Sequence, residues 1–427
     1  MWGIQCTGAR RTLSTAVKKR TTTFRAVLLP VPLTRSAAPP FHDNAPGTTT
    51  VGRRVCVYSA SGGDSGAALG LRPSVLVMQP TTFCNLNCRY CYLPDRGKRL
   101  DMPATVNRAA AESVARWRDS GHQIEVLWHA GEPLAVGVRK FEDLLSDWPP
   151  GTAHHIQTNA TLIDEAWCDL FDRYHVRVSV SIDGPRGMNS GRVTRGGGPA
   201  WRRIAAGIAV LRRRGIPFHV LSVVRDPAPE VARLVYAHAC DIGAEVLGIL
   251  PEETKGSHGE GSPAGKSEWV GFFAELFTQW RANPVVRLRE IESVANCYDA
   301  VRSGITEAEV LSMPVEPIPT VSYNGEVTVM SPDLAGFRHP RHGAFTVGNV
   351  LRHPLEDLLS RAGSVPWVRE ALAGVDACRR TCRYAVACGG SWPANKYFEL
   401  GRLDGTETNF CRNLHQAKTE GALPCHP

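Results

Sequence analysis

The sequence has no apolar run of roughly 20 residues, the length that a membrane-spanning helix needs, so it predicts a soluble protein with no membrane partner. It also has no Asp or Glu between Met1 and His42, although that stretch carries seven Lys and Arg residues. Removing these seven charges from the net charge of +8 leaves a body near +1. A general nucleic-acid-binding face is therefore not expected.

The first 73 residues lack sustained hydrophobic periodicity and are rich in Arg, Ser, Thr, Gly and Pro. An organellar transit peptide has this acidic-poor composition. A disordered extension, or a start codon placed too far upstream, is the alternative, and it is the interpretation we favour. Residues 1–73 are expected to be unfolded in each case.

The thirteen cysteines do not fit a secreted disulfide framework, because the chain is long and has no signal peptide. Three lie within Cys84–Cys91 and four within Cys378–Cys411. In a reduced cytoplasm, where we expect this protein, such groups indicate metal sites.

From Ser74 to Leu250, short β-branched runs alternate with amphipathic segments. Repeated strand–helix units give parallel strands with right-handed crossovers. They predict an α/β fold, a partial (β/α)6 barrel over residues 74–250 with its working face at the carboxyl ends of the strands. The expected strands are Val75–Met78, Ile124–Trp128, His155–Asn159, Arg177–Ile182, Phe218–Val224 and Glu245–Leu250, and the expected helices are Pro103–Arg118, Val138–Ser146, Asp164–Tyr174, Trp201–Arg214 and Pro229–Asp241.

After Leu250 the alternation stops. Residues 251–319 are expected to be a linking loop and helices, and residues 320–427 a second domain around the later cysteines. That domain is expected to open with a hairpin whose Asn324-Gly325 pair predicts a type I′ turn.

Cys84, Cys88 and Cys91 have a Cys-x3-Cys-x2-Cys spacing directly after the first expected strand. Three thiolates can hold three irons of a cubane cluster and leave the fourth iron open to a ligand. A zinc knuckle is the alternative, but structural zinc usually takes four ligands, and no fourth stands nearby. The spacing therefore favours an open iron–sulfur cluster.

This stretch resembles the cluster motif of the radical S-adenosylmethionine (SAM) superfamily, and the resemblance extends to Cys411. The family's Gly-Gly-Glu-Pro motif appears as Ala130-Gly131-Glu132-Pro133, with its first glycine replaced. The resemblance implies a [4Fe–4S] cluster, SAM, a 5′-deoxyadenosyl radical, and an electron donor such as ferredoxin or flavodoxin. It also implies that the residues which bind SAM are Ala130, Gly131, Glu132, Asn159, Ser181, Asp183 and Arg192.

Alternation along the third and fourth strands supports this cofactor site. Polar residues share one face of each strand: His155, Gln157 and Asn159 on the third, and Ser179, Ser181 and Asp183 on the fourth. These faces would line the barrel interior, where a charged cofactor could use them; a hydrated interior without a ligand is the alternative. Arg195 competes with Arg192 for the cofactor's carboxylate.

Cys378, Cys382, Cys388 and Cys411 offer four ligands, enough to saturate one further cubane. Their arrangement resembles the SPASM extension of radical peptide-modifying enzymes, whose full form carries two auxiliary clusters and seven cysteines. Because Val327–Leu334 contains no cysteine, we expect one auxiliary [4Fe–4S] cluster. A four-cysteine zinc site is the alternative.

Within that family, the chain resembles the cyclophane-forming maturases of ribosomally made peptides in actinobacteria. The runs that carry this resemblance include Met330–Gly336, Gly348–Val350 and Tyr397–Glu399. It implies a carbon–carbon bond between an aromatic ring and a β-carbon of a precursor peptide. Glu252 and Glu253, directly after the sixth strand, are candidates for the base that this reaction needs. Solvated loop acids are the alternative.

Other functions remain open at this stage. A sulfatase-maturing oxidase is disfavoured by the missing second auxiliary cluster, and a thioether-forming maturase requires a cysteine in its peptide. A zinc-binding scaffold without enzymatic activity is the alternative from another class. The segment before Ser74 is too irregular for a leader-binding domain, so a partner or the C-terminal lobe is expected to recognise the peptide leader.

Overall fold

The computed structural model describes residues 66–259 and 261–422, with the side chains of 297–299 and 301 excepted. The prediction for residues 1–65 lies outside this range. Within it, residues 68–70 already pair with residue 315: Gly70 N–H donates to the Val315 carbonyl at 2.8 Å, and Val315 N–H to the Ala68 carbonyl at 2.7 Å. Residues 68–70, which lie before the predicted boundary at residue 74, are therefore held in place by a partner far along the sequence.

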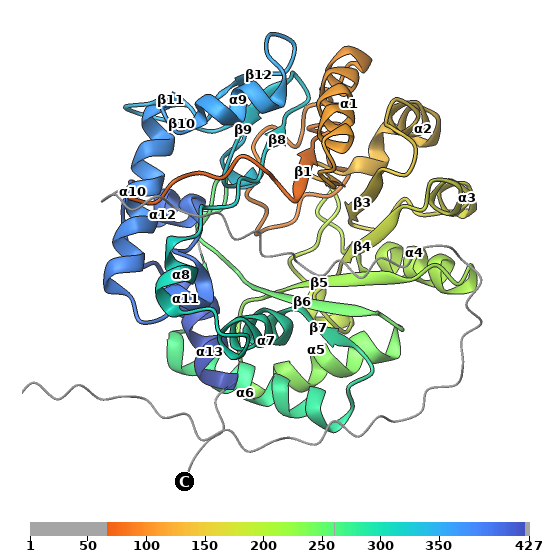
Figure 1. Cartoon of the computed structure of the whole chain (residues 1–427). Helices are drawn as coiled ribbons and strands as arrows, with labels where there is room; N and C mark the ends of the chain where they lie inside the picture. The colour runs from red at the N-terminus through yellow and green to blue at the C-terminus, as the bar shows by residue number, and fades with distance from the viewer. Residues whose placement is uncertain (1–65, 260, 423–427) are drawn as a thin grey trace, which may run out of the picture. The chain divides into compact units, whose positions relative to one another are not determined.

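A ten-stranded sheet forms the centre of the fold, with the order β12-β9-β8-β1-β2-β3-β4-β5-β6-β7 (Figure 1). Each neighbouring pair from β8 through β1 to β7 is parallel. The strands are β1 Val75–Met78, β2 Glu125–Trp128, β3 Ala153–Thr158, β4 Arg177–Ser181, β5 Phe218–Val224, β6 Val246–Pro251, β7 Arg287–Leu288, β8 Thr320–Val321, β9 Glu326–Thr328 and β12 Gly348–Asn349, with a separate pair β10 Arg338–His339 and β11 Gly343–Ala344.

Helices connect the barrel strands where the sequence predicts them. They are α1 Ala104–Asp119, α2 Val138–Ser146, α3 Glu165–Tyr174, α4 Trp201–Arg213 and α5 Pro229–Asp241, with short 3-10 turns η1 Pro133–Val136 and η2 Arg186–Asn189. Asp164 caps α3 as expected, since its carboxylate accepts the Trp167 N–H at 3.1 Å. The predicted α/β fold with a (β/α)6 core is confirmed.

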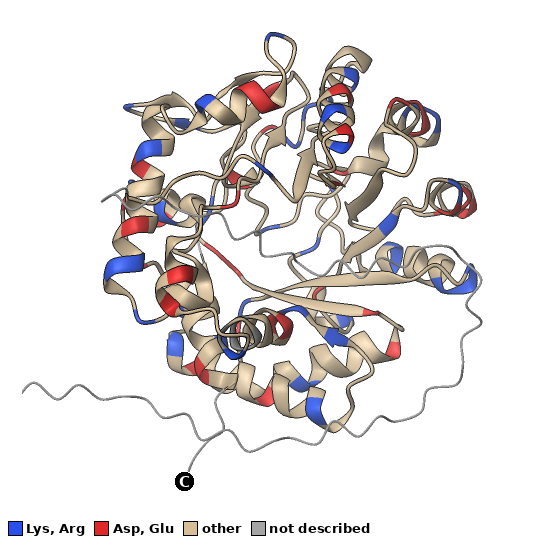
Figure 2. Cartoon of the chain, viewed as in Figure 1, with Lys and Arg blue, Asp and Glu red and all other residues tan. Residues whose placement is uncertain are grey.

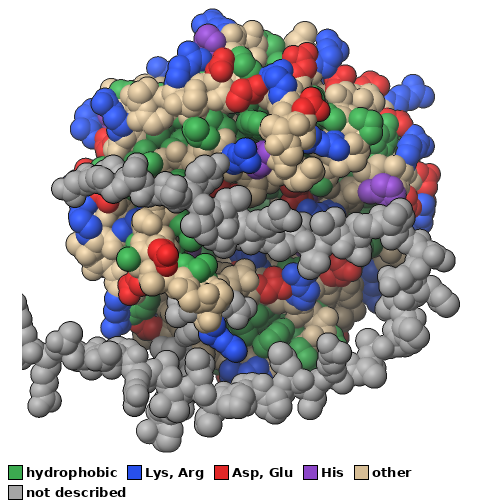
Figure 3. Space-filling view, in the orientation of Figure 1, with side chains coloured by type: hydrophobic (Ala, Val, Ile, Leu, Met, Phe, Trp, Pro, Cys, Tyr) green, Lys and Arg blue, Asp and Glu red, His purple; other side chains and the backbone are tan. Residues whose placement is uncertain are grey.

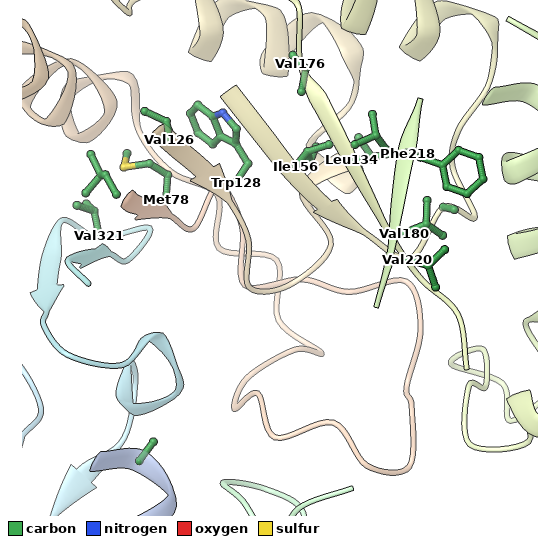
Figure 4. Close-up of a cluster of buried hydrophobic side chains, with 14 of the residues drawn as sticks. Met78, Val126, Trp128, Leu134, Ile156, Val176, Val180, Phe218, Val220 and Val321 are labelled. Atoms are coloured by element: carbon green, nitrogen blue, oxygen red, sulfur yellow. The ribbon is translucent and has the colours of Figure 1, made fainter. Parts of the chain in front are cut away.

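The outward faces of the strands pack against these helices. Trp128 at the end of β2 meets Phe141 of α2 edge to face, with ring centroids 5.1 Å apart. Figure 4 shows this layer, with labelled side chains that include Met78, Val126, Trp128, Ile156, Val180, Phe218, Val220 and Val321. All of them are buried, so the sheet is closed to water on this side.

Three helices follow the barrel: α6 Lys266–Ala282, α7 Arg289–Arg302 and α8 Glu307–Ser312. The α6 helix buries Trp269, Phe272, Phe273 and Phe277. The last helix, α13 Ala417–Ala422, lies along α6 (Figure 1). A methyl group added at Gly421 would come within 2.9 Å of Phe273 Cβ, so this glycine sets the close approach of the two helices.

The C-terminal part continues the barrel sheet through β8, which pairs with β1. Its further elements are η3 Pro332–Leu334, α9 Leu355–Ala362, α10 Pro366–Thr381, α11 Ala385–Cys388, α12 Pro393–Leu400 and a π-helix at Cys411–Gln416. The division of the chain at residues 250 and 320 stays a prediction. The described residues belong to one compact unit.

The β8–β9 hairpin is present, but its turn differs from the predicted type I′. Ser322 N–H donates to the Glu326 carbonyl, which leaves a three-residue loop, and Gly325 N–H donates to the Ser322 carbonyl. Gly325 has φ +86°, whereas Asn324 is not among the residues with positive φ. A type I turn followed by a left-handed glycine is the usual three-residue hairpin, so the glycine, and not the Asn-Gly pair, determines the turn.

Basic and acidic residues both occur among the outer helices (Figure 2). The face drawn in Figure 3 likewise has both signs side by side on its described surface. None of the described helices is long and apolar enough to cross a membrane.

Candidate active site and cluster sites

The loop that follows β1 carries Cys84, Cys88 and Cys91. Main-chain hydrogen bonds fix its course: Cys84 N–H donates to the Arg96 carbonyl at 3.0 Å, Asn87 N–H to Val193 at 2.8 Å and Arg89 N–H to Gly191 at 2.9 Å. The loop is therefore held against the segment that contains Arg192.

The three thiols of this loop lie close enough to affect one another's ionisation. Burial, together with the charges of Glu132, Cys88 and Cys91, raises the pKa of Cys84 to about 12. Three thiolates in such a place repel one another unless a cation lies between them. The donor set therefore fits an iron cluster, whose binding would release the thiol protons.

Their spacing is too wide for a single zinc ion. In tetrahedral zinc sites the Zn–S bond is about 2.3 Å, which brings the sulfurs to about 3.8 Å from one another. Among the described residues, the group of three or more ligand atoms within 4.8 Å of one another is His339, His342 and Glu370. No three cysteine sulfurs are that close in either cysteine group, which favours a larger cluster over zinc.

The His339 group is itself a poor metal site. His339 Nδ1 accepts the N–H groups of Arg341 at 3.0 Å and His342 at 3.3 Å. A neutral imidazole with an accepting Nδ1 carries its proton on Nε2, so neither nitrogen has a free lone pair. His342 and Glu370 already hydrogen-bond to each other at 2.7 Å, and we assign this group a structural role.

The turn after β2 presses directly against the cysteine loop. Gly131 has φ +76°, and a methyl group there would lie 2.3 Å from the Thr81 carbonyl oxygen and 2.9 Å from that of Phe83. Ala130, which stands where the family has its first glycine, also has positive φ, at +69°. The turn thus keeps the left-handed backbone that two glycines would adopt without strain.

Glu132 holds this turn to the end of β3. Its buried carboxylate accepts hydrogen bonds from the Thr158 hydroxyl at 2.6 Å, Asn159 N–H at 2.8 Å and Leu134 N–H at 3.1 Å. Burial raises the pKa of Glu132 to about 7. With these bonds in place, the side chain positions the loop. SAM binding by Ala130, Gly131 and Glu132 stays a prediction.

Asn159 reaches back to the first cysteine. Its amide nitrogen donates to Asn85 Oδ1 at 2.9 Å and lies 3.8 Å from Cys84 Sγ. Its side-chain Oδ1 accepts a hydrogen bond from the Thr161 hydroxyl at 2.6 Å. The end of β3 and the cysteine loop therefore form one polar network.

Asp183 and Arg192 form a buried ion pair on the other side of the loop, with Arg192 Nη2 2.7 Å from Asp183 Oδ1. Tyr90, one residue before Cys91, donates its hydroxyl to Asp183 Oδ2 at 2.6 Å. Val223 N–H also donates to Asp183, at 3.0 Å. The Nε of Arg192 is buried without a partner, and the charge of Arg192 acts on Cys88. That free donor near the cysteines suits a carboxylate of SAM.

Arg195 is engaged elsewhere, because its guanidinium donates to the Cys84 carbonyl at 3.3 Å and the Arg96 carbonyl at 3.2 Å. Arg192 is therefore the better candidate for the cofactor's carboxylate. The polar faces of β3 and β4 meet as the alternation predicts: His155 contacts Ser179 at 2.7 Å, and Gln157 donates to Ser181 at 2.8 Å. Ser181 lies at this inner face.

The second cysteine group also converges. Cys378 ends a buried stretch of α10, Cys388 ends α11, and Cys411 begins the π-helix. Burial, together with the charges of Cys388 and Cys382, raises the pKa of Cys411 to about 12. Nitrogen donors approach these sulfurs: Gly390 N–H lies 3.4 Å from Cys388 Sγ, and the Gln416 amide 3.7 Å from Cys411 Sγ.

Between the barrel and the C-terminal lobe lies a set of polar side chains that we call the junction cluster: Tyr92, His129, Glu253, Lys255, Asp333 and Asn395. Lys255 Nζ is 2.7 Å from Asp333 Oδ2 and 3.5 Å from Glu253 Oε2, and it lies 5.0 Å from the centre of the Tyr92 ring. Asn395 of α12 donates to Glu253. The cluster therefore joins the residue after Cys91 to the ends of β2 and β6.

The two predicted base candidates differ within this region. Burial raises the pKa of Glu253 to about 7, although Lys255 acts in the opposite direction. Glu252 instead pairs with Arg225 at 2.9 Å and contacts His258 at 3.0 Å. Glu252 thus anchors the loop after β6, and Glu253 is the better candidate for a base.

Sequence reasoning did not single out the rest of the junction cluster. Tyr92 directly follows Cys91 and His129 directly precedes Ala130. Their position next to the two recognised motifs is the signal that could have identified them. Asp333 and Asn395 join them only through the fold, and no local pattern marks either residue.

Comparison with known proteins identifies the class. The sequence profile of the radical SAM superfamily matches residues 78–227. An uncharacterized protein of Synechocystis sp., sll1766, is 30% identical over 372 residues, which cover 82% of this chain and 92% of that protein. The chain belongs to the radical SAM superfamily and is an enzyme that uses a [4Fe–4S] cluster and SAM.

Peptide- and protein-modifying members are among its relatives. The serine-type anaerobic sulfatase-maturating enzyme of Klebsiella aerogenes is 28% identical over 220 residues, 49% of this chain and 54% of that protein. The structure of anSMEcpe with bound AdoMet and Cp18Cys peptide has a TM-score of 0.64 at 18% identity and covers 82% of this chain and 97% of that one. Streptococcus suis SuiB bound to SAM has a TM-score of 0.58 at 15% identity and covers 80% and 78%. These structures share the fold.

Proposed function

We propose that this enzyme matures a ribosomally made precursor peptide by forming carbon–carbon cyclophane cross-links. The observation that carries the proposal is the position of Glu253, whose carboxyl group is partly buried and has a pKa of about 7. It lies in the junction cluster with Tyr92, the residue that follows Cys91. A base with a pKa near the working pH is suited to general base catalysis.

The groups that would hold the cofactors are those described above. We assign the SAM-binding cluster to Cys84, Cys88 and Cys91, and the auxiliary cluster to Cys378, Cys382, Cys388 and Cys411. When bound, the first cluster and SAM supply a 5′-deoxyadenosyl radical that removes a hydrogen atom from carbon, and the auxiliary cluster supplies an acceptor for one electron.

Cross-linking removes two hydrogens from the peptide for each new bond. One leaves the β-carbon as a hydrogen atom and ends in 5′-deoxyadenosine. The other leaves the aromatic carbon as a proton and an electron once the new bond has formed. In this proposal the Glu253 carboxylate takes the proton, and Asn395, which donates to it, holds it in place.

A peptide substrate is supported by the shared fold with anSMEcpe, which has been solved with a bound peptide. The external electron donor that we propose is of the ferredoxin or flavodoxin type. The sequence runs Met330–Gly336 and Tyr397–Glu399 favour the cyclophane type. Asp333 within the first run and Asn395 just before the second belong to the junction cluster.

Oxidation of a serine or cysteine side chain, as in sulfatase maturation, is the second candidate. Its support is the similarity to the Klebsiella aerogenes enzyme. The single four-cysteine group speaks against it, because the full SPASM extension carries two auxiliary clusters.

The test is anaerobic co-expression with a candidate precursor peptide, followed by tandem mass spectrometry. We expect a loss of two hydrogens per modification and no backbone fragmentation between the linked residues. Serine oxidation also removes two hydrogens, so a hydrazide probe is added: labelling of the product would identify an aldehyde and refute the cross-link. Unmodified peptide despite SAM cleavage would point to a different substrate class.

A further inference from the structure

Lys396 on α12 is buried completely, with 0% of its surface exposed. Its ammonium group lies at the four-cysteine site, where Nζ donates to Cys378 Sγ at 3.5 Å. Space for it comes from Gly374 of α10: a methyl group there would lie 3.1 Å from Lys396 Nζ and 2.4 Å from the Leu403 carbonyl oxygen. The close packing of α10 and α12 thus places the Lys396 side chain beside the cysteine sulfurs.

The surroundings of Lys396 hold no carboxylate partner. In the described part of the chain, none of the ion pairs includes Lys396, and Cys378 Sγ is the acceptor of its one hydrogen bond. Burial lowers the pKa of Lys396, and the charges of Cys378, Cys388 and Cys411 act in the opposite direction. A buried ammonium group is strongly unfavourable unless an anion compensates it. The anion available here is the set of cysteine thiolates.

A four-thiolate cubane meets this requirement. The thiolates carry more negative charge than the oxidised iron–sulfur core carries positive charge, and reduction adds one more electron. A fixed positive charge and a hydrogen bond to a ligating sulfur both stabilise the reduced form, which raises the reduction potential.

We propose that Lys396 is the counter-charge of the auxiliary cluster and makes that cluster the better electron acceptor of the two. This inference rests on the proposed assignment of the four cysteines, and it gives the electron released during cross-linking a destination. Lys396 acts through Cys378 and does not touch the peptide, so it is a positioning residue.

The first cluster site has a different electrostatic environment. The carboxylate of Glu132 acts on Cys84, and the charge of Arg192 is compensated by Asp183 at 2.7 Å. The reduction potential would then be lower at the SAM-binding cluster and higher at the auxiliary cluster. Electrons from the SAM-binding cluster or from the substrate would therefore move to the auxiliary cluster.

The experiment uses the full-length chain with Cys84→Ala, Cys88→Ala and Cys91→Ala, so that bound iron reports the auxiliary site alone. In this parent, Lys396→Met removes the charge and Lys396→Arg keeps it. The midpoint potential is measured by anaerobic redox titration, followed by visible absorbance and electron paramagnetic resonance. Lys140→Met is the matched control, because Lys140 pairs with Asp101 on the barrel surface at 3.1 Å.

We expect Lys396→Met to shift the oxidised-to-reduced ratio at a given potential at least tenfold toward the oxidised form, a decrease of about 59 mV for one electron. Lys396→Arg and Lys140→Met should remain near the parent. If Lys396→Met loses the iron while Lys396→Arg keeps both iron and potential, the charge requirement is likewise supported.

Parent-like potentials in Lys396→Met would overturn the inference, as would a higher potential. Loss of iron from both lysine variants would also overturn it, because the site would then depend on side-chain shape and not on charge. If the parent itself binds no iron, the cluster assignment fails first and the lysine inference fails with it. Iron content and potential therefore distinguish the two failures.

Discussion

Three acidic side chains of the barrel differ in the groups that surround them: Glu132 and Asp183, which are buried, and Glu253, which is partly buried. Glu132 accepts hydrogen bonds from neutral donors, including the Thr158 hydroxyl. Asp183 has a buried arginine as its partner. Glu253 has a shared lysine and a pKa of about 7. The pKa of Glu132 is also about 7, but three hydrogen bonds hold its carboxylate in the turn. Glu253 is therefore the residue that we propose to exchange a proton during the reaction.

The Asp183–Arg192 pair gives a stability prediction. Arg192→Met should lower the free energy of unfolding by about 3–5 kcal/mol, because it leaves the buried Asp183 carboxylate without its counter-charge. The double variant with Asp183→Asn should be less destabilised than the sum of the two single variants. Urea unfolding measures this cycle. Arg173→Met, which breaks an exposed pair with Glu142, should change stability by about 0–1 kcal/mol; strict additivity at the buried pair would contradict the prediction.

Glu253 gives a pH prediction. A carboxyl group accepts a proton only when it is ionised, so the cross-linking rate should rise as the pH increases through about 7 and level off above it. Glu253→Gln should remove this dependence and slow product formation while 5′-deoxyadenosine is still released. Glu252→Gln is the control and should keep the pH dependence. An unchanged profile in Glu253→Gln would exclude this residue as the base.

Gly131 gives a prediction for the first cluster. Gly131→Ala should prevent the cysteine loop from closing, because the new methyl group would overlap the Thr81 carbonyl oxygen at 2.3 Å. The expected result is a loss of about half of the bound iron, with loss of SAM cleavage. Gly121→Ala is the matched control, since Gly121 has the same φ of +76° and nothing within 4 Å of the added methyl group. Equal iron loss in both variants would show that backbone strain alone is responsible.

At the scale of elements, α13 and α6 determine where Cys411 lies. The π-helix that begins at Cys411 runs directly into α13, and α13 packs on α6 through Gly421. The i to i+5 spacing of the π-helix also places the Gln416 amide 3.7 Å from Cys411 Sγ. Docking of α13 therefore positions a cluster ligand and its hydrogen-bond donor together.

Gly421→Leu tests this arrangement. The larger side chain should push α13 away from Phe273 and lower both the thermal midpoint and the auxiliary iron content, leaving about four irons on the first cluster. Gly271→Leu in α6 is the control, because a methyl group added at Gly271 meets nothing within 4 Å. Full iron content in Gly421→Leu would show that Cys411 is held by other contacts.

An element could be predicted from the sequence where the signals for it are local, and not where it depends on pairing with a distant part of the chain. The six barrel strands and five helices were predictable, because periodicity and caps such as Asp164 are local signals. The β7 and β8 strands have two residues each and exist through pairing with β6 and β1, which local sequence does not encode. The cysteine sites were recognisable by spacing, whereas the junction cluster and Lys396 depend on side chains that only the tertiary fold brings together.

At the scale of the whole molecule, the two proposed cluster sites should lose their iron independently of each other. The anaerobically reconstituted enzyme should contain about eight irons. Replacing Cys84, Cys88 and Cys91 by alanine should leave about four and abolish SAM cleavage. Replacing the four later cysteines should also leave about four, while SAM cleavage continues without cross-linked product. Zinc in place of iron at the later site, measured by elemental analysis, would contradict the auxiliary cluster.

The β1 strand has hydrogen-bonded neighbours from distant parts of the chain, with Val77 opposite both Leu127 of β2 and Thr320 of β8. During synthesis one edge of β1 stays open until the ribosome has passed Thr320, and pairings of such long sequence separation form slowly. The cysteine loop that follows β1 gains its final support at that late stage. Translation that stops after Leu250 would leave all six barrel strands with an unpaired edge at β1, the kind of edge from which chains aggregate.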